Sequence, residues 1–288
     1  MSQPPAFSFH LSPGQVLGER FEVSEDRRQG GLSVAFRAND RQTEEAVELQ
    51  LFPLSLFEAG DEASEFAASW TPWLEVDSPH LVGVREVVAY PDAGLLLVTD
   101  PPKGTCLRTH FEQSGPMEEA QVIDCGLQLL AGLDVLHDHG LVHGDLKPLT
   151  IFVEPDGARL TTQLADGGTT HGLWTAKGLG ERTALIGTPY YAPVEQFGGD
   201  APTVQSDIYN LATVLFELAT GVQPWAGKSF LEVFQSKLER TPPTMAQRAP
   251  QANVSEKLEA AIRGGLHAAR EQRYPSCEAF RQALEQCA

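Results

Sequence analysis

The sequence predicts a bilobal α+β protein, in which a smaller β-rich lobe is followed by a larger helical lobe. Three observations support this prediction. Short apolar alternations between Gln15 and Leu51 are typical of a β-meander. The stretch Asp100-Pro-Pro-Lys-Gly104 is a strong breaker and a candidate hinge. From Glu118 onward, the apolar residues recur at helical spacing.

Composition excludes several classes of protein. The 288 residues carry a net charge of −18, which argues against surfaces that bind nucleic acid or anionic lipid. No apolar run reaches transmembrane length and no signal peptide is present, so we expect no membrane insertion. Four scattered cysteines indicate neither a zinc site nor a disulfide framework, and we expect a cytoplasmic protein.

The first lobe is expected at residues 15–100, after an extension at 1–14 that is either a flexible lead or a strand-like arm. A helix from Ser55 to Leu74 should end or kink at Pro72, which lacks a backbone N–H. Apolar patterning predicts the strands of this lobe at Phe21–Val23, Val34–Phe36, Val47–Leu51, Leu81–Val88 and Leu95–Thr99.

The second lobe is expected at residues 105–288, after a hinge at 101–104. Val122, Gly126, Leu129, Leu133 and Leu136 share one face of a helix from Glu118 to His137. Residues 167–186 are rich in Gly and Thr and predict a mobile segment. The remaining predicted elements are strands at Thr150–Val153 and Arg159–Leu164, a buried helix at Asp207–Ala219, and helices at 229–239, 255–267 and 276–286.

The stretch from Leu141 to Ile151 places polar residues between two short apolar runs, as in a loop held between buried elements. It reads His143-Gly-Asp-Leu-Lys-Pro-Leu-Thr150, which resembles the His-Arg-Asp-Leu-x-x-x-Asn loop of eukaryotic-like (Hanks-type) Ser/Thr protein kinases, bacterial type. The resemblance implies that Asp145 orients a substrate hydroxyl and that Lys147 contacts phosphate. Thr150 stands where the family has a metal-binding Asn, and Gly144 stands where it has Arg. We expect His143 to be structural.

Later motifs extend this resemblance over about residues 18–286. Asp166-Gly-Gly stands where the family has Asp-Phe-Gly, so the resemblance implies that Asp166 holds magnesium. The Phe of that motif packs against a helix of the first lobe in active kinases, and Gly167 has no side chain to do so. The resemblance also implies that Asp207 tethers the catalytic loop and that Glu195 pairs with Arg273. The implied fold is that of protein kinases.

The first lobe departs from the kinase pattern. The resemblance assigns nucleotide contacts to Gly30, Gly31, Gln50, Asp100 and Thr150. Only part of the Gly-rich loop remains, and Gln50 replaces the Lys that pairs with phosphates. The acidic partner of that Lys would fall near Ser69, so both halves of the family's Lys–Glu ion pair are missing.

These departures favour a pseudokinase, a regulatory or scaffolding module with impaired or absent phosphoryl transfer and a protein partner. The alternative is an atypical active Ser/Thr kinase that uses ATP and Mg with Asp145 and Asp166. A third possibility, transfer of another part of a nucleotide, has no positive sign in the sequence. Loss of the Lys, its partner and the Asn removes several charges and donors that phosphoryl transfer needs, which makes ATP and Mg doubtful cofactors.

Overall fold

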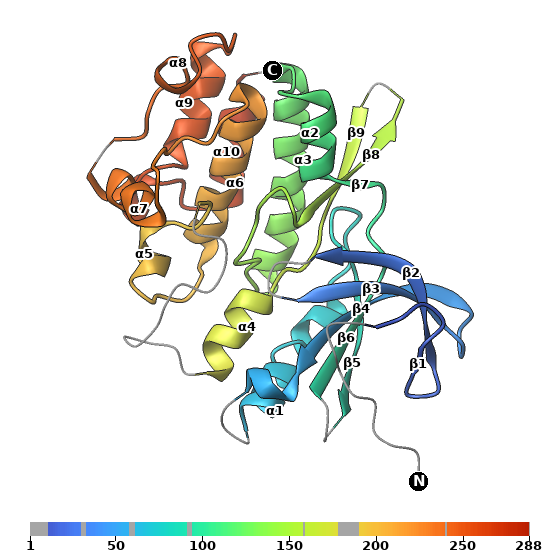
Figure 1. Ribbon diagram of the computed structural model, residues 1–288. Helices are drawn as coiled ribbons and strands as arrows, with labels where there is room; N and C mark the ends of the chain where they lie inside the picture. The colour runs from blue at the N-terminus through green and yellow to red at the C-terminus, as the bar shows by residue number, and fades with distance from the viewer. Residues whose placement is uncertain are drawn as a thin grey trace.

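The computed structural model describes residues 11–29, 33–57, 61–90, 94–157, 159–177, 190–239 and 241–287, without the side chains of 25–29, 230 and 239. These residues form a sheet-rich lobe and a helical lobe joined near Thr99 (Figure 1). The predicted bilobal α+β architecture is confirmed. Within the described residues, no helix is long and apolar enough to cross a membrane.

The first lobe is built on a six-stranded antiparallel sheet with the strand order β1-β2-β3-β4-β6-β5. Alternation along β4 sends Val47, Leu49 and Leu51 into a core on one face, while Gln50 points to the other face. The strands are β1 (Val16–Leu17), β2 (Phe21–Gln29), β3 (Val34–Asp40), β4 (Glu45–Pro53), β5 (Val84–Tyr90) and β6 (Gly94–Thr99).

The helix predicted at Ser55–Leu74 is broken into short pieces. They are the 3-10 helix η1 (Leu54–Leu56), α1 (Glu62–Ala68) and the 3-10 helix η2 (Thr71–Glu75). Pro72 lies at the start of η2, so the predicted break at this residue is confirmed. The strand predicted from Leu81 begins only at Val84, because the backbone of residues 80–82 bonds instead to Leu164 in the second lobe.

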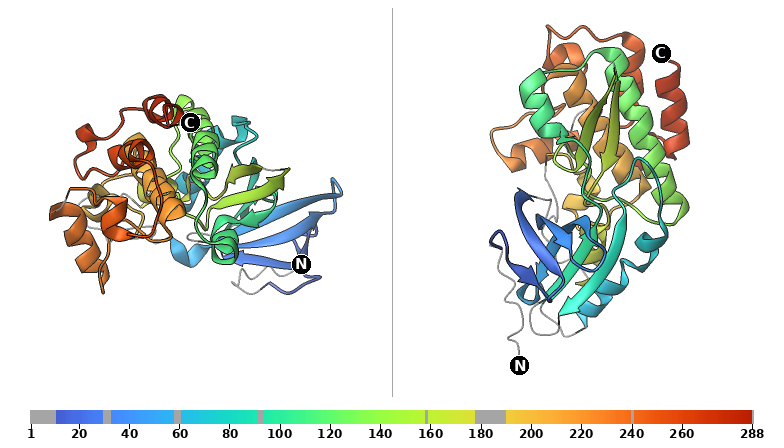
Figure 2. Two further views of the ribbon diagram at one scale, coloured as in Figure 1. Left: turned by 90° about the horizontal axis from the view of Figure 1, so that it is seen from above. Right: turned by 90° about the vertical axis from the view of Figure 1, so that its right-hand side faces the viewer.

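The second lobe packs helices around α6 (Val204–Thr220), which is buried along nearly its whole length as predicted. In Figure 2, the red helix α10 (Cys277–Glu285) runs alongside the green helix α3 (Glu119–Asp138), in agreement with their packing. Its sheet has the strands β7 (Thr105–Cys106), β8 (Ile151–Asp156) and β9 (Arg159–Leu164). The helical elements are α2 (Leu107–Ser114), α3 (Glu119–Asp138), α4 (Thr169–Ala176), α5 (Val194–Phe197), α6 (Val204–Thr220), α7 (Phe230–Glu239), α8 (Met245–Arg248), α9 (Glu256–Gly264), η3 (Arg270–Gln272) and α10 (Cys277–Glu285).

The segment predicted to be mobile at 167–186 contains a helix instead. Helix α4 begins after Gly168, whose left-handed conformation (φ 78°) turns the chain into it, and packs against α1 (Figure 1). Trp174 is anchored there, since its Nε1 donates to the Gly199 carbonyl at 2.8 Å. Sequence reasoning missed α4 because its Gly and Thr residues have low helix propensity, which tertiary packing overrides. Residues 178–186 lie outside the described residues.

Candidate functional site

A buried carboxylate at the start of α6 holds the catalytic-like loop. Asp207 is 0% exposed and accepts hydrogen bonds from the backbone N–H groups of His143 and Gly144, each at 2.8 Å. His137 Nε2 lies 3.0 Å from the same carboxylate. The tether implied by the family resemblance is therefore confirmed.

His143 is buried beneath this loop. Its Nε2 lies 3.0 Å from the Ala165 carbonyl oxygen, and burial lowers the pKa of its ring despite the nearby carboxylates of Asp207 and Asp145. A β-carbon on Gly167 would come within 3.2 Å of this ring, so the Asp166-Gly-Gly turn lies directly against it. His143 is therefore a packing residue, as the sequence predicted.

Asp145 and Lys147 face each other within the loop. Lys147 Nζ donates to Asp145 Oδ2 at 2.5 Å, and both residues are buried. The Thr150 hydroxyl lies 3.1 Å from the carbonyl oxygens of Asp145 and Lys147 and accepts from the Lys147 N–H at 3.1 Å. Thr150 is 0% exposed, so its hydroxyl serves the loop rather than a ligand.

A hydrogen bond between side chains joins the two lobes. Gln50 Nε2 donates to Asp166 Oδ1 at 2.7 Å, and the Ser33 hydroxyl donates to Gln50 Oε1 at 3.1 Å. Asp166 adopts a left-handed backbone conformation (φ 62°), which costs a non-glycine residue about 1 kcal/mol. Gln50 therefore bonds to the carboxylate to which the resemblance assigns magnesium.

The other predicted nucleotide contacts behave differently. Asp100 Oδ1 accepts from Arg85 Nε at 2.6 Å, in an ion pair at the surface. The Asp100 side chain is thus engaged at the surface of the first lobe. It does not line the cavity between the lobes to which Gln50, Asp166 and His143 contribute. Gly30 and Gly31 lie outside the described residues.

Sequence reasoning did not single out three further residues of this region. Glu48 is 5% exposed and shares a strand face with Gln50, two residues along β4. Trp70 and Trp73 line a cavity between the lobes together with Gln50 and Asp166, and its volume is only about 20 Å³. The sequence did contain an indication of Glu48, because Glu48 and Gln50 alternate with apolar residues in the run Val47-Glu-Leu-Gln-Leu51 and must share the face opposite the apolar side chains.

These residues do not fit a magnesium–nucleotide complex. Gln50 is neutral, Asp166 binds Gln50, and the Thr150 hydroxyl is enclosed by its own loop. In the part of the chain that the structure describes, no group of three or more His, Cys, Asp or Glu side chains could hold a metal ion. At Gln50, Asp166 and Thr150, the side chains that stand at the family's phosphate and metal positions thus make contacts within the protein.

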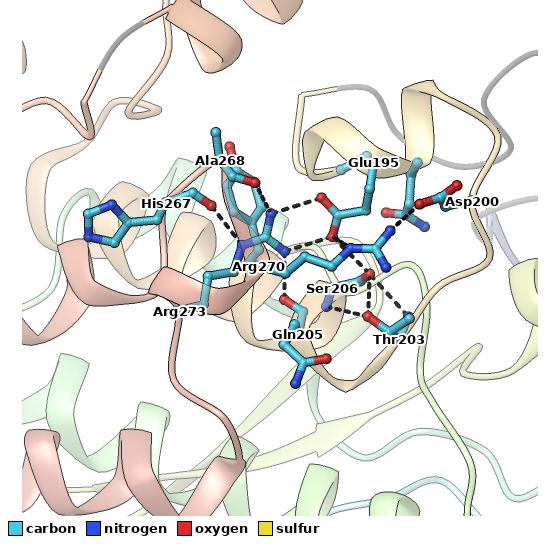
Figure 3. A network of polar contacts seen from close by, with 12 residues as sticks. Glu195, Asp200, Thr203, Gln205, Ser206, His267, Ala268, Arg270 and Arg273 are labelled. Carbon is cyan, nitrogen blue, oxygen red and sulfur yellow. Dashed lines mark hydrogen bonds and ion pairs between the residues drawn. The ribbon is translucent and has the colours of Figure 1, made fainter.

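The structural ion pair near the end of the chain is intact (Figure 3). Arg273 donates to both carboxylate oxygens of Glu195, at 2.7 and 2.8 Å. Its remaining N–H groups donate to the carbonyl oxygens of His267, Gln205 and Ala268, so all five donors have acceptors. The pairing implied by the resemblance is therefore confirmed.

The two lobes, the Asp207 tether and the Glu195–Arg273 pair define a protein of the kinase class. Residues 25–285 match the family described as "Protein kinase domain". This match covers most of the chain, so the chain belongs to the protein kinase domain family.

Bacterial Ser/Thr kinases are among the relatives that resemble the chain in sequence. The chain is 26% identical over 239 residues to a probable serine/threonine-protein kinase PknB of Lactococcus lactis, covering 83% of this chain and 37% of that protein. It is 34% identical over 173 residues to PkaB of Streptomyces coelicolor, covering 57% of this chain and 40% of that protein. The chain thus spans well under two thirds of the length of these relatives.

Solved structures share the fold. The kinase domain of Mycobacterium tuberculosis PknI, solved as a double mutant, has a TM-score of 0.74 at 16% identity and covers 96% of this chain and 98% of that one. Rad53 1–466 in complex with AMP-PNP has the same TM-score and identity, covering 91% of this chain and 64% of that one.

Proposed function

We propose that the protein is a pseudokinase, a kinase-fold module that regulates or scaffolds a protein partner with impaired or absent phosphoryl transfer. One observation carries this proposal: Gln50 stands at the position of the phosphate-pairing Lys and hydrogen-bonds to Asp166. The residue that should grip phosphate and the residue that should hold metal bind each other.

Electrostatics support the proposal. Phosphoryl transfer relies on positive charges that stabilise the transferring group, and each such interaction is worth a few kcal/mol. Gln50 brings no charge, and the Lys147 ammonium group is paired with the Asp145 carboxylate. These two positions therefore give a triphosphate little of the positive charge that phosphoryl transfer needs.

The second candidate is an atypical active Ser/Thr kinase that uses ATP and Mg. The position of Asp145, buried at the tethered loop beside Lys147, favours it. For transfer to occur, Asp145 would have to part from Lys147 and Asp166 from Gln50, and a cation would have to take the place of the missing Lys. Each separation breaks a polar contact that is at least partly buried, which opposes activity.

The partner that we propose is a protein with a neutral or basic docking surface. The net charge of −18 opposes association with another strongly acidic molecule and with nucleic acid. The chain retains the family contacts made by Asp207 and by the Glu195–Arg273 pair. These contacts stabilise the fold and take no direct part in phosphoryl transfer.

A thermal-shift titration with ATP, alone and with Mg²⁺ or Mn²⁺, tests the proposal. We expect a shift of less than about 1 °C, because the phosphate and metal sites are occupied by internal contacts. A transfer assay with γ-labelled ATP follows, on the wild type and on Asp145→Asn, which keeps the size of the side chain. Transfer of labelled phosphate to protein by the wild type but not by Asp145→Asn, together with a metal-dependent rise in melting temperature, would establish the active kinase instead.

A further inference from the structure

The turn after Asp166 lacks the large side chain of the kinase motif, yet the space above it is filled. A β-carbon built on Gly167 would lie 2.8 Å from the Trp73 indole, closer than real side-chain contacts allow. Gly167 does not have a left-handed backbone, so the indole, and not the local conformation, excludes a larger residue. Gly168 is covered by the same ring.

Trp73 reaches this turn from the other lobe. It belongs to η2, and its ring packs on Trp70 with centroids 5.6 Å apart. The aromatic contacts continue through Phe66 in α1 to Phe52 in β4, with centroid separations of 6.0 and 4.8 Å. This row of rings fixes Trp73 to the sheet of the first lobe, and Trp73 is only 8% exposed.

The turn beneath Trp73 leads directly into α4. The Gly168 N–H donates to the His143 carbonyl at 2.9 Å, and the Gly172 N–H donates to the Gly168 carbonyl at 2.7 Å. Gly172 also lies against α1, because a β-carbon there would meet Ser69 and Phe66. The glycines at 167, 168 and 172 thus form a small-residue surface that receives bulky side chains from the first lobe.

We propose that Trp73 takes the place of the aromatic side chain missing at position 167, and that it locks the segment from Asp166 to α4 against the first lobe. The ring is supplied by another element, 94 positions earlier in the chain. Trp73 and the Gln50–Asp166 hydrogen bond together hold the lobes closed without nucleotide. This contact joins the lobes whether or not the protein transfers a phosphoryl group.

A size-exchange cycle tests this assignment. Trp73→Ala should lower the melting temperature by about 5–10 °C, because it leaves a large cavity, and Gly167→Phe should also lower it through overlap with the indole. The double variant W73A/G167F should melt above both single variants, since the new ring fills the new cavity. If the decrease in melting temperature of the double variant equalled the sum of the two single decreases, the proposal would be overturned.

Gly126 provides the matched control. It lies in α3, where a β-carbon would meet Leu284 and Leu215 rather than Trp73. Gly126→Leu with Trp73→Ala should therefore show additive losses, whereas Gly167→Leu with Trp73→Ala should show partial rescue. Rescue in both pairs would mean a general effect of Trp73→Ala and would reject the assignment.

Hydrogen exchange gives a second readout if a double variant fails to fold. In Trp73→Ala, the amides of Gly168 and Gly172 should lose at least about tenfold more protection than the amides of α6, whose exchange follows only the global stability. Trp73→Phe should retain most of the protection. A loss of protection at Gly168 and Gly172 no larger than that of α6 would overturn the proposal independently of the cycle.

Discussion

Lys237 illustrates how much a single residue can depend on its surroundings. Its side chain is 1% exposed, and its ammonium group donates to the carbonyl oxygens of Tyr190 at 3.0 Å and Ala192 at 2.7 Å. Burial lowers the pKa of Lys237 to about 7, with Arg273 acting in the same direction and Glu195 opposing it. The side chain thus ties the segment at 190–192 to α7.

This shift predicts how stability changes with pH. The folded pKa lies below that of the unfolded chain, so the unfolded state binds more protons between pH 7 and about 10. Stability should therefore rise with pH in this window, by at most about 1.4 kcal/mol per unit. We expect the stability of the wild type relative to Lys237→Met to increase from pH 7 to pH 9 in chemical denaturation. A difference that stays constant would contradict this.

Between the lobes, the spacing of the motifs located the altered positions but did not predict their new contacts. A motif is recognised from residues that are neighbours in the sequence, so it identified Gln50 and Thr150 as replacements and Asp166 as a retained residue. The hydrogen bond from Gln50 to Asp166 joins residues 116 positions apart and arises from the way the lobes meet. No local pattern encodes such a contact, and the same is true of Trp73 above Gly167.

Among the elements, the strongest periodic patterns were the best predicted. Helix α3 and the buried helix α6 follow their predicted spans closely, because long apolar stripes leave little choice of structure. Helix α4 was missed because its residues are Gly- and Thr-rich, and α2 and α8 were missed because they are short. These elements owe their existence to packing rather than to propensity.

The link between α5 and the chain around η3 predicts a large effect on stability. Arg273 is 0% exposed at its side chain and Glu195 only 8%, so removing Arg273 leaves a buried carboxylate whose remaining ion pair, with Arg270, is longer, at 3.5 Å. Arg273→Met should lower the free energy of unfolding by about 3–5 kcal/mol. Arg273→Lys should also be destabilising, because Lys offers fewer donors than the acceptors that now surround the guanidinium group.

The double variant Glu195→Gln with Arg273→Met serves as the control for this prediction. It removes both charges, so it should be more stable than Arg273→Met alone when both are unfolded in urea. If the double variant were less stable than Arg273→Met, the buried charge of Glu195 would not be the cause of the loss.

At the scale of the whole molecule, the larger of two hydrophobic clusters in the described residues passes through both lobes, and the other lies within the first lobe. The larger cluster includes Phe52 and Leu97 of the first sheet, Trp73, and Phe280 of α10. Backbone hydrogen bonds add to it, since the Leu164 N–H donates to the His80 carbonyl and the Val82 N–H to the Leu164 carbonyl, each at 2.8 Å. The lobes are therefore not independent folding units.

This continuity predicts a single cooperative unfolding transition in calorimetry, with a calorimetric enthalpy equal to the van't Hoff enthalpy. Lobes joined only by a hinge would melt separately, and a nucleotide would be needed to couple them. Here the Trp73 contact and the Gln50–Asp166 hydrogen bond already couple them, so ATP should leave the shape of the transition unchanged. Two resolved transitions in the wild type would show that the shared core does not hold the lobes together. Two transitions in Trp73→Ala alone would place that coupling at the aromatic contact.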